Sequence, residues 1–297
     1  MRSIWTMIGL LLLSQSAAGF ERGDQAVVVR LTEMKVITGS SLVLTPGTAV
    51  VVREIEQDRL KVAAGRVGWI DPSAVIPANQ ADAHFSQLIE KNPQDAVALL
   101  ARGKVRFEKA GLDADKIDNA TVDLDQSLKL APSSEALTIR GYGWKRKGDK
   151  DKAMADFDEA IKLNPKEALA WRIRGATWAS KADYAKTLAD YSESIRIDPE
   201  NPDSLHHRVV LRSVCMDERF RDGKQAIVDA TKACEVSEWS SSLYLAGLAM
   251  ANAEAGDFDA AIKWQTKAME LSSAPAGAMQ GNLELFRQHK PMRMTWR

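Results

Sequence analysis

The sequence predicts a mainly α-helical protein: a solenoid of antiparallel helical hairpins preceded by a small all-β region. Two observations lead to this prediction. Prolines recur at a nearly constant spacing through the middle of the chain, and short strand-like stretches with turns between them precede these repeats. After Pro77 the composition shifts to Ala, Asp, Lys and Leu, which separates the two patterns.

The first residues have the layout of a secretory signal peptide. Arg2 supplies a positive charge, residues 4–13 form an apolar run, and residues 16–19 are small. The run is shorter than the roughly 20 residues that cross a bilayer. We therefore expect residues 1–19 to be a signal peptide and the protein to be exported, either periplasmic or extracellular. An uncleaved anchor or a buried strand is the alternative.

Composition gives no argument for a nucleic-acid partner. The 40 Lys and Arg residues balance the 40 Asp and Glu residues, so no net charge attracts an anionic polymer or membrane. No later segment is long and apolar enough to span a bilayer, so we expect no integral membrane segment after signal cleavage.

Residues 22–77 have the pattern of a small β-barrel. Apolar or alternating stretches occupy residues 26–31, 42–44, 50–52, 59–62 and 67–70, and turn residues such as Pro46 and Gly47 separate them. Short strands this close together are typical of a small barrel.

The end of this region, from Gly68 through Trp69 and Ile70 to Val75, resembles the closing segment of bacterial Src-homology-3-like barrels. Versions that bind proline-rich peptides need a groove lined by aromatic residues. Trp69 is the one aromatic residue in this segment, so we expect a structural or spacing role with Trp69 in the core. The alternative is a cell-wall or peptide contact at Trp69.

The prolines mark internal repeats. Each lies twelve residues after a small or β-branched residue, as in the pairs Ala81 and Pro93, Ala120 and Pro132, Ala153 and Pro165, and Thr187 and Pro199. The segments resemble the tetratricopeptide repeat. The best copy reads Trp171, Gly175, Trp178, Thr187, Tyr191, Ser194 and Pro199.

The resemblance implies a repeat solenoid over residues 79–290. It would comprise a half repeat at 79–93, about five repeats over 96–273 and a capping helix at 276–289, before a tail at 291–297. Small residues would let the two helices of a hairpin approach, and proline would end the second helix. The repeats near Lys109 and Arg219 each carry five extra residues, which predict longer loops.

A charged pattern accompanies the repeats. Position 7 of four repeats is Arg and position 23 is Asp, which predicts four ion pairs between the helices of one hairpin. The pairs are Arg102 with Asp123, Arg140 with Asp156, Arg174 with Asp190, and Arg208 with Asp229. In the last repeat both charges are absent together, since Leu248 and Trp264 take their places.

No chemistry-bearing motif stands out. The four histidines lack metal-ligand spacing, and no nucleophile signature occurs, so we expect no enzyme activity, no cofactor and no metal. Cys215 and Cys234 would lie roughly 15 Å apart along a hairpin, too far for a disulfide.

The resemblance places a partner-binding groove along the first helices, at positions 2, 5, 9, 12 and 13. Its candidate residues are Tyr142, Lys145, Arg146, Arg172, His206 and Val210. It implies a non-enzymatic scaffold outside the cytoplasm that binds an extended or helical segment of a partner protein. Two alternatives stay open: these side chains form only a solvated face, or the β region binds envelope glycan or peptide and the repeats are a spacer.

Overall fold

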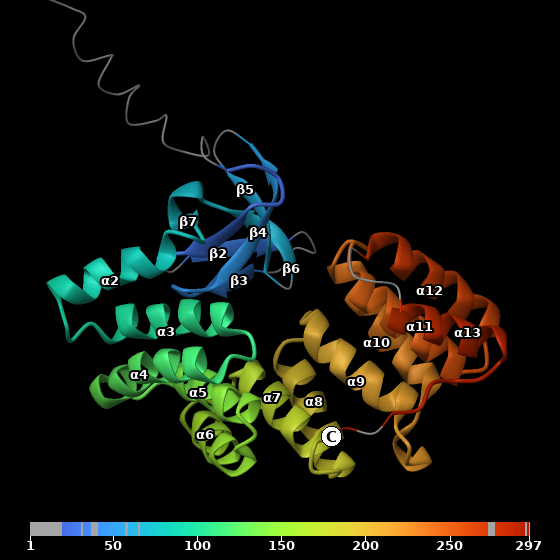
Figure 1. The fold of residues 1–297 in the computed structure, drawn as a ribbon. Coiled ribbons are helices and arrows are strands. Elements are labelled where there is room, and N and C mark those ends of the chain that lie inside the picture. Colours follow the sequence, from blue (N-terminus) through green and yellow to red (C-terminus); the bar gives the residue numbers. More distant parts are fainter. Residues whose placement is uncertain are drawn as a thin grey trace, which may run out of the picture. The chain divides into compact units, whose positions relative to one another are not determined.

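The structure is a computed structural model, and it describes residues 20–30, 32–36, 41–56, 59–64, 66–272, 277–294 and 296. The chain divides into two compact units, one up to Lys147 and one from Gly148. Figure 1 labels their elements. The predicted signal peptide at 1–19 lies outside the described residues and stays a prediction. The predicted fold class is confirmed, because a strand region precedes a chain that is otherwise mostly helical.

The first unit begins with one antiparallel sheet. Its strands are β1 (Gln25–Val28), β2 (Thr32–Val36), β3 (Ser41–Leu44), β4 (Ala49–Ile55), β5 (Leu60–Ala64), β6 (Arg66–Ile70) and β7 (Val75–Pro77), with the short helix η1 (Pro72–Ala74) before the last. They pair in the order β3-β2-β6-β5-β4-β1-β7. Every strand contributes to one buried core, which includes Val28, Met34, Leu60 and Ile70, so the sheet curls around it. The resemblance to a Src-homology-3-like barrel stays a prediction.

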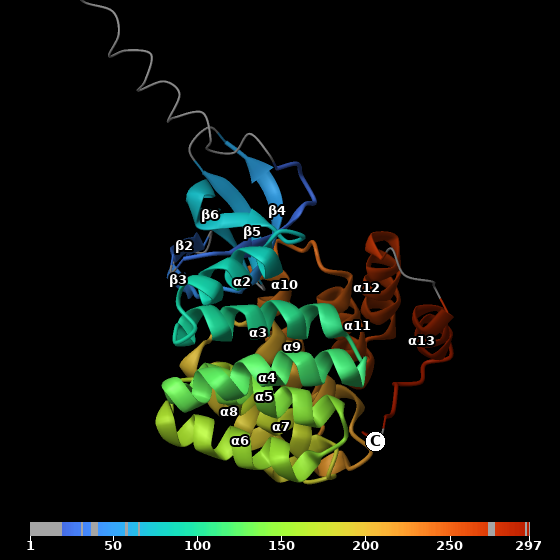
Figure 2. The ribbon, with the colours of Figure 1, turned by 60° about the vertical axis from the view of Figure 1, so that its left-hand side comes forward.

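A second buried cluster joins the sheet to the first helices, which lie next to the strands in Figure 2. Val27 packs with Phe85 and Val105 in one buried cluster. The turn before β4 also touches α3, because a Cβ at Gly47 would lie 2.8 Å from the carbonyl oxygen of Ala101. Residue 78, where we expected a boundary, therefore lies within a packed junction.

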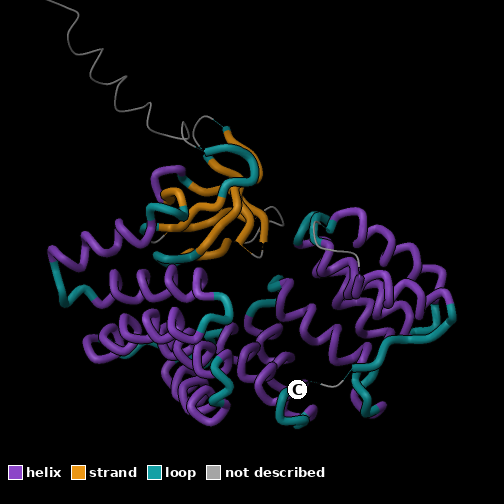
Figure 3. The backbone as a smooth tube through the Cα atoms, in the orientation of Figure 1, coloured by secondary structure: helices purple, strands orange, loops and turns teal. Residues whose placement is uncertain are grey.

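The helices of the first unit are purple in Figure 3: α2 (Ala81–Lys91), α3 (Ala96–Ala110), α4 (Ala114–Leu130) and α5 (Ser134–Arg146). The predicted longer loop near Lys109 is wrong. The extra residues lengthen α3 and α4 to 15 and 17 residues. Gly111 turns the chain with φ +56°, and the Asp113 side chain accepts a hydrogen bond from the Lys116 N–H at 3.2 Å.

The second unit continues the hairpins. Its helices are α6 (Lys150–Leu163), α7 (Ala168–Ala179), α8 (Tyr184–Ile197), α9 (Pro202–Val214), α10 (Gly223–Val236), α11 (Ser242–Glu254), α12 (Phe258–Leu271) and α13 (Gly277–Arg287). The predicted longer connection near Arg219 does occur, and it contains the short helix η2 (Glu218–Phe220). Within the described residues, α13 occupies most of the stretch where we expected a capping helix.

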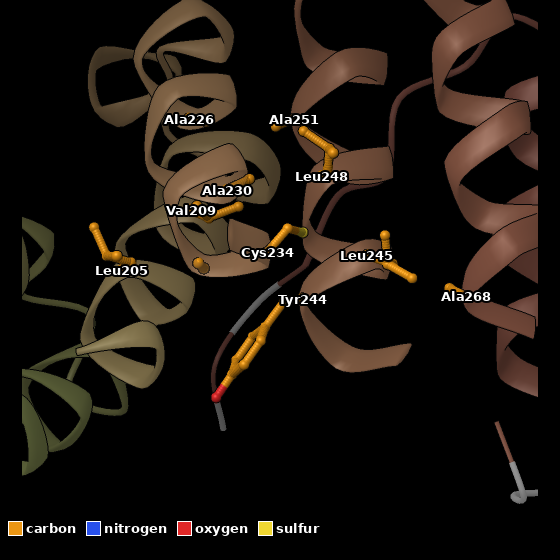
Figure 4. Close-up of a cluster of buried hydrophobic side chains, with 11 residues drawn as sticks. Leu205, Val209, Ala226, Ala230, Cys234, Tyr244, Leu245, Leu248, Ala251 and Ala268 are labelled. Carbon is orange, nitrogen blue, oxygen red and sulfur yellow. The ribbon is translucent and has the colours of Figure 1, made fainter. Parts of the chain in front are cut away.

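Small residues let the helices of the second unit pack closely. Figure 4 shows the cluster in which Leu205, Val209 and Leu245 meet alanines of neighbouring helices. Cys234 belongs to this cluster, whereas Cys215 belongs to another one with Tyr191. Both thiols are free and buried. In the part of the chain that is described, no helix combines the length and apolar character that a membrane span needs.

Candidate partner-binding face

The structure brings together three of the predicted ion pairs. The Arg102 guanidinium lies 2.7 Å from the Asp123 carboxylate, and the pairs Arg174–Asp190 and Arg208–Asp229 are each 2.8 Å apart. The three carboxylates are almost fully buried, at 3%, 6% and 4% exposure. Arg140 and Asp156 belong to different units, so their pair stays a prediction.

Sequence reasoning missed the second partner of these arginines. Each also reaches the second helix of the preceding hairpin, so it links two hairpins. Arg102 and Arg208 donate to hydroxyls at 3.2 Å, whereas Arg140 and Arg174 donate to carboxylates at 2.7 and 2.8 Å. The four acceptors are Ser86, Asp125, Asp158 and Ser192. The sequence contains a signal for these second partners, because Asp125, Asp158 and Ser192 each follow a predicted ion-pair aspartate by two residues.

Hydrogen bonds and burial act in opposite directions on the pKa values of the Arg174–Asp190 pair. Hydrogen bonds to Asp190 raise the pKa of the Arg174 guanidinium. Burial raises the pKa of the Asp190 carboxyl, although the bonds from Arg174 act to lower it. Asp190 therefore depends on Arg174 to stay ionised inside the hairpin, which is a structural role.

Of the groove residues predicted in the first unit, Arg146 contacts aromatic rings and the end of α3. Its guanidinium lies 4.4 Å from the Phe107 ring centroid and 4.5 Å from that of Tyr142, and it donates to the Gly111 carbonyl at 3.0 Å. Arg146 therefore caps the C-terminal end of α3 by its hydrogen bond to Gly111. Lys145 lies farther out over Tyr142, at 6.0 Å.

The second unit gathers the other candidates on the face formed by α7, α9 and α11, the first helices of its hairpins. We call this the first-helix face. Arg172 of α7 lies 3.2 Å from His207 Nε2 and 3.8 Å from the Asp203 carboxylate of α9. The Tyr244 hydroxyl of α11 donates to the other Asp203 oxygen at 2.8 Å. Asp203 therefore connects both neighbouring helices.

His206 and Val210 of α9 belong to the same face, and His206 is held by close packing. Its ring lies 5.8 Å from that of Tyr244, and a Cβ at Gly247 would come within 2.8 Å of its Nδ1 atom. This burial lowers the pKa of His206 to about 4, so the imidazole is neutral at pH 7. The Tyr244 pKa is raised, first by burial and then by Asp203.

The positive charge beside Asp203 comes from Arg172. A guanidinium only donates hydrogen bonds, so His207 Nε2 must accept, and the His207 ring is neutral while the contact exists. The Arg172 Nε atom is buried without a hydrogen-bond partner, and a terminal nitrogen of the guanidinium lies 3.8 Å from the Asp203 carboxylate, which is too long for a hydrogen bond. Arg172 thus retains donor capacity for a carboxylate.

Asp203, His207 and Tyr244 were absent from our predicted site. Asp203 occupies position 2 of its repeat, which is a groove position, so periodicity alone could have identified it. Position 3, where Tyr244 lies, carries no such signal. Among the described residues, no group of three or more His, Cys, Asp or Glu side chains could hold a metal ion.

Trp69 is only half-buried, so its predicted place in the core of the sheet is wrong. Ile70 points into the core and Trp69, its neighbour on β6, points to the other face. The Arg59 guanidinium lies 4.3 Å from the Trp69 ring centroid and covers one face of the ring. A ligand stacking on that face would have to displace Arg59, which weighs against a binding site there.

Comparisons with known proteins identify the repeats. Family models described as tetratricopeptide repeat match residues 145–202 and 244–275. Human "Tetratricopeptide repeat protein 6" is 33% identical over 88 residues, which are 30% of this chain but 16% of that protein. The chain thus spans about a sixth of this relative.

Two solved structures share the fold at low sequence identity. The Cut9–Hcn1 hetero-tetramer of APC/C has a TM-score of 0.58 at 19% identity, covering 71% of this chain and 40% of that one. PilW, a type IV pilus biogenesis factor, has a TM-score of 0.53 at 19% identity, covering 69% of this chain and 90% of that one. At such identity the likeness shows the fold alone.

Proposed function

Because this chain carries tetratricopeptide repeats, a fold that generally serves protein–protein interaction, we propose that it is a non-enzymatic scaffold outside the cytoplasm. It binds an extended or helical segment of a partner protein on the first-helix face. The observation that carries this proposal is Arg172, a cation with unused donor capacity beside Asp203, His207 and Tyr244.

The chemistry of this face favours a segment with a carboxylate side chain. Arg172 is 18% exposed, so its charge is poorly solvated and gains from an incoming anion. His206 is neutral at pH 7 and adds no second charge. A single carboxylate near the middle of the segment therefore satisfies the site, and apolar residues around it contact Val210.

Site-specific photo-crosslinking tests the location of the partner. A photoreactive amino acid replaces Val210 on the first-helix face or, as the matched control, Val228 on α10, which is 61% exposed. We expect one partner segment to crosslink from position 210 and not from 228. Its synthetic peptide should bind the parent protein and lose at least tenfold in affinity with Arg172→Glu, since a charge-assisted contact becomes a repulsion.

The control substitution is Lys162→Glu, at a Lys side chain that is 76% exposed on α6. It makes the same charge change away from the first-helix face. Equal crosslinking from 210 and 228, or equal peptide affinity in the parent and in Arg172→Glu, would contradict the proposed site.

The proposed location has a separate test. Residues 1–19 have the composition of a signal peptide. We expect the exported protein to begin near Phe20, as determined by N-terminal sequencing of the fraction outside the cytoplasm. Leu11→Arg interrupts the apolar run and should keep the protein inside the cell. Export of this variant at the parental level would contradict the proposal.

A further inference from the structure

A slot on the second unit begins where α9 ends. Val214 is the last residue of α9, and Cys215 leaves the helix with extended backbone angles (φ −57°, ψ 134°). The backbone of Cys215 pairs in parallel with Met294, and the Met294 N–H donates to the Val214 carbonyl at 2.9 Å. Residues 292–294 therefore lie beside the end of α9, where this isolated pairing holds them.

An aromatic side chain fills the apolar end of this slot. The Trp296 ring lies 5.4 Å from that of Tyr184, and Tyr184 contacts Phe220 of η2 at 5.8 Å. These rings pack against a buried cluster that contains Leu211 and Cys215. The Cys215 side chain is fully buried in the presence of this cover.

A charged group fixes the other end. The Arg293 guanidinium lies 2.6 Å from the Glu254 carboxylate and 3.3 Å from the Ser213 carbonyl oxygen. Glu254 is also bound by Arg221 at 2.9 Å, and Arg221 donates to the Cys215 carbonyl at 2.9 Å. Glu254 and Arg221 therefore preset the position at which an incoming arginine binds.

We propose that this slot is a peptide-binding site, separate from the first-helix face, and that residues 292–294 and 296 of the chain itself occupy it in a displaceable way. It takes an extended segment with an arginine and, three residues later, an aromatic side chain. Recognition combines main-chain pairing with a side-chain pocket, as in β-strand addition. A partner segment with the same two side chains competes for the slot.

The contacts of the described residues explain why exchange is feasible. Residues 292–294 and 296 are held by one backbone hydrogen bond, one ring contact and the Arg293 contacts, and they follow α13, which ends at Arg287. Because they are tethered, their effective concentration is about millimolar, so a free peptide competes poorly with the parent. Weakening the tethered copy should let a free peptide enter.

Thiol labelling of Cys215 measures the occupancy of the slot in the full chain. Cys234→Ala leaves Cys215 as the one thiol. We expect slow labelling in this parent and roughly tenfold faster labelling after Trp296→Ala, since the ring contact is lost. Arg293→Ala should accelerate labelling as well. Trp239→Ala, at another half-exposed tryptophan of the same unit, is the matched control and should leave the rate unchanged.

The decisive step adds the synthetic peptide of residues 290–297 to the Trp296→Ala protein. The peptide should slow the labelling of Cys215 again, and the same peptide with Trp296→Ala should not. This result supports a binding site. Equal labelling in the parent and in Trp296→Ala, or no protection by the peptide, overturns the proposal. A second variant combines Cys215→Ala with Trp296→Ala, so that Cys234 is its one thiol. Slow labelling of Cys234 in this variant would show that the unit stays folded without Trp296. Fast labelling would show that Trp296 is part of the fold and would overturn the proposal.

Discussion

The buried pair Arg174–Asp190 allows a quantitative test of how the hairpins are stabilised. Two hydrogen bonds join the side chains, at 2.9 Å and 2.8 Å. Arg174 is 18% exposed and Asp190 is 6% exposed. Removing one member of a fully buried pair costs about 3–5 kcal/mol, because the other charge stays buried without a partner.

The expected cost here is smaller because Arg174 keeps another partner. In Asp190→Leu, Arg174 still donates to Asp158 at 2.8 Å. We therefore expect Asp190→Leu to lower the free energy of unfolding by about 2–3 kcal/mol, below the fully buried range. Arg174→Met leaves the buried Asp190 without its bidentate partner and should cost more, about 3–5 kcal/mol.

A double-mutant cycle separates the pair from the other contacts. Arg174 also lies 4.7 Å from the Trp171 ring centroid, and that contact is lost in both Arg174→Met and the double variant, so it cancels. No orphan charge remains in the double variant, which should therefore be little worse than either single variant. The coupling free energy should be about 2 kcal/mol.

Urea unfolding followed by circular dichroism measures these free energies, with unchanged denaturant dependence as the check on comparability. The exposed pair Glu193–Arg196 on the same helix is the control and should show no measurable coupling. A coupling free energy for Arg174–Asp190 below about 0.5 kcal/mol would refute the argument that burial makes this pair matter.

Three further predictions follow from packing and charge. Gly175→Ala should lower the free energy of unfolding in urea by about 1–3 kcal/mol, since its Cβ would lie 2.9 Å from the Tyr191 ring. Gly281→Ala has open space around it and should raise the free energy of unfolding by about 1 kcal/mol. A stabilising effect of Gly175→Ala would contradict the close packing at Gly175. Lys104 Nζ donates hydrogen bonds to Glu135 at 2.6 Å and to Thr45 at 2.7 Å, so Lys104→Met should lower the free energy of unfolding by about 1–3 kcal/mol. Amide hydrogen exchange in the turn at Thr45 should become faster in this variant, and an unchanged exchange rate would contradict the prediction. His206 has a folded-state pKa of about 4 against an ordinary 6.5, so the unfolded chain binds its proton first and stability should fall as pH drops from 6.5 towards 4; His206→Gln should lose less stability over that window, and an equal loss would count against the assignment.

The sequence predicts the hairpins well because their periodicity is local. Proline spacing locates the ends of second helices, and the recurrent Arg and Asp lie opposite each other wherever both helices have standard lengths. The same reasoning failed at Lys109, because five extra residues can extend two helices as easily as a loop. Sequence spacing does not distinguish these outcomes, since Ala, Lys and Asp are accepted in both.

Side-chain partners were harder to predict than helices. Arg146 occupies a groove position, yet its guanidinium lies over both Phe107 and Tyr142, which come from different helices. Trp69 follows the alternation of β6 and faces away from the core. Residue type alone does not give the direction of a side chain, which the neighbouring elements determine.

Arg174 and Arg208 each bind a side chain of the preceding hairpin, so these links between hairpins of the second unit run in one direction along the chain. Each arginine ties its own hairpin to the one before it, so the melting of one hairpin removes a bond from the next. The hairpin of α11 and α12 has Leu248 and Trp264 in place of this pair, and Trp264 stacks on Trp239 at 5.3 Å. In a one-dimensional array, such links couple each unit to its neighbour. Opening of the α7–α8 hairpin therefore removes a bond from the α9–α10 hairpin, whereas other groups, Tyr244, Trp264 and Glu254, hold the α11–α12 hairpin to its neighbour.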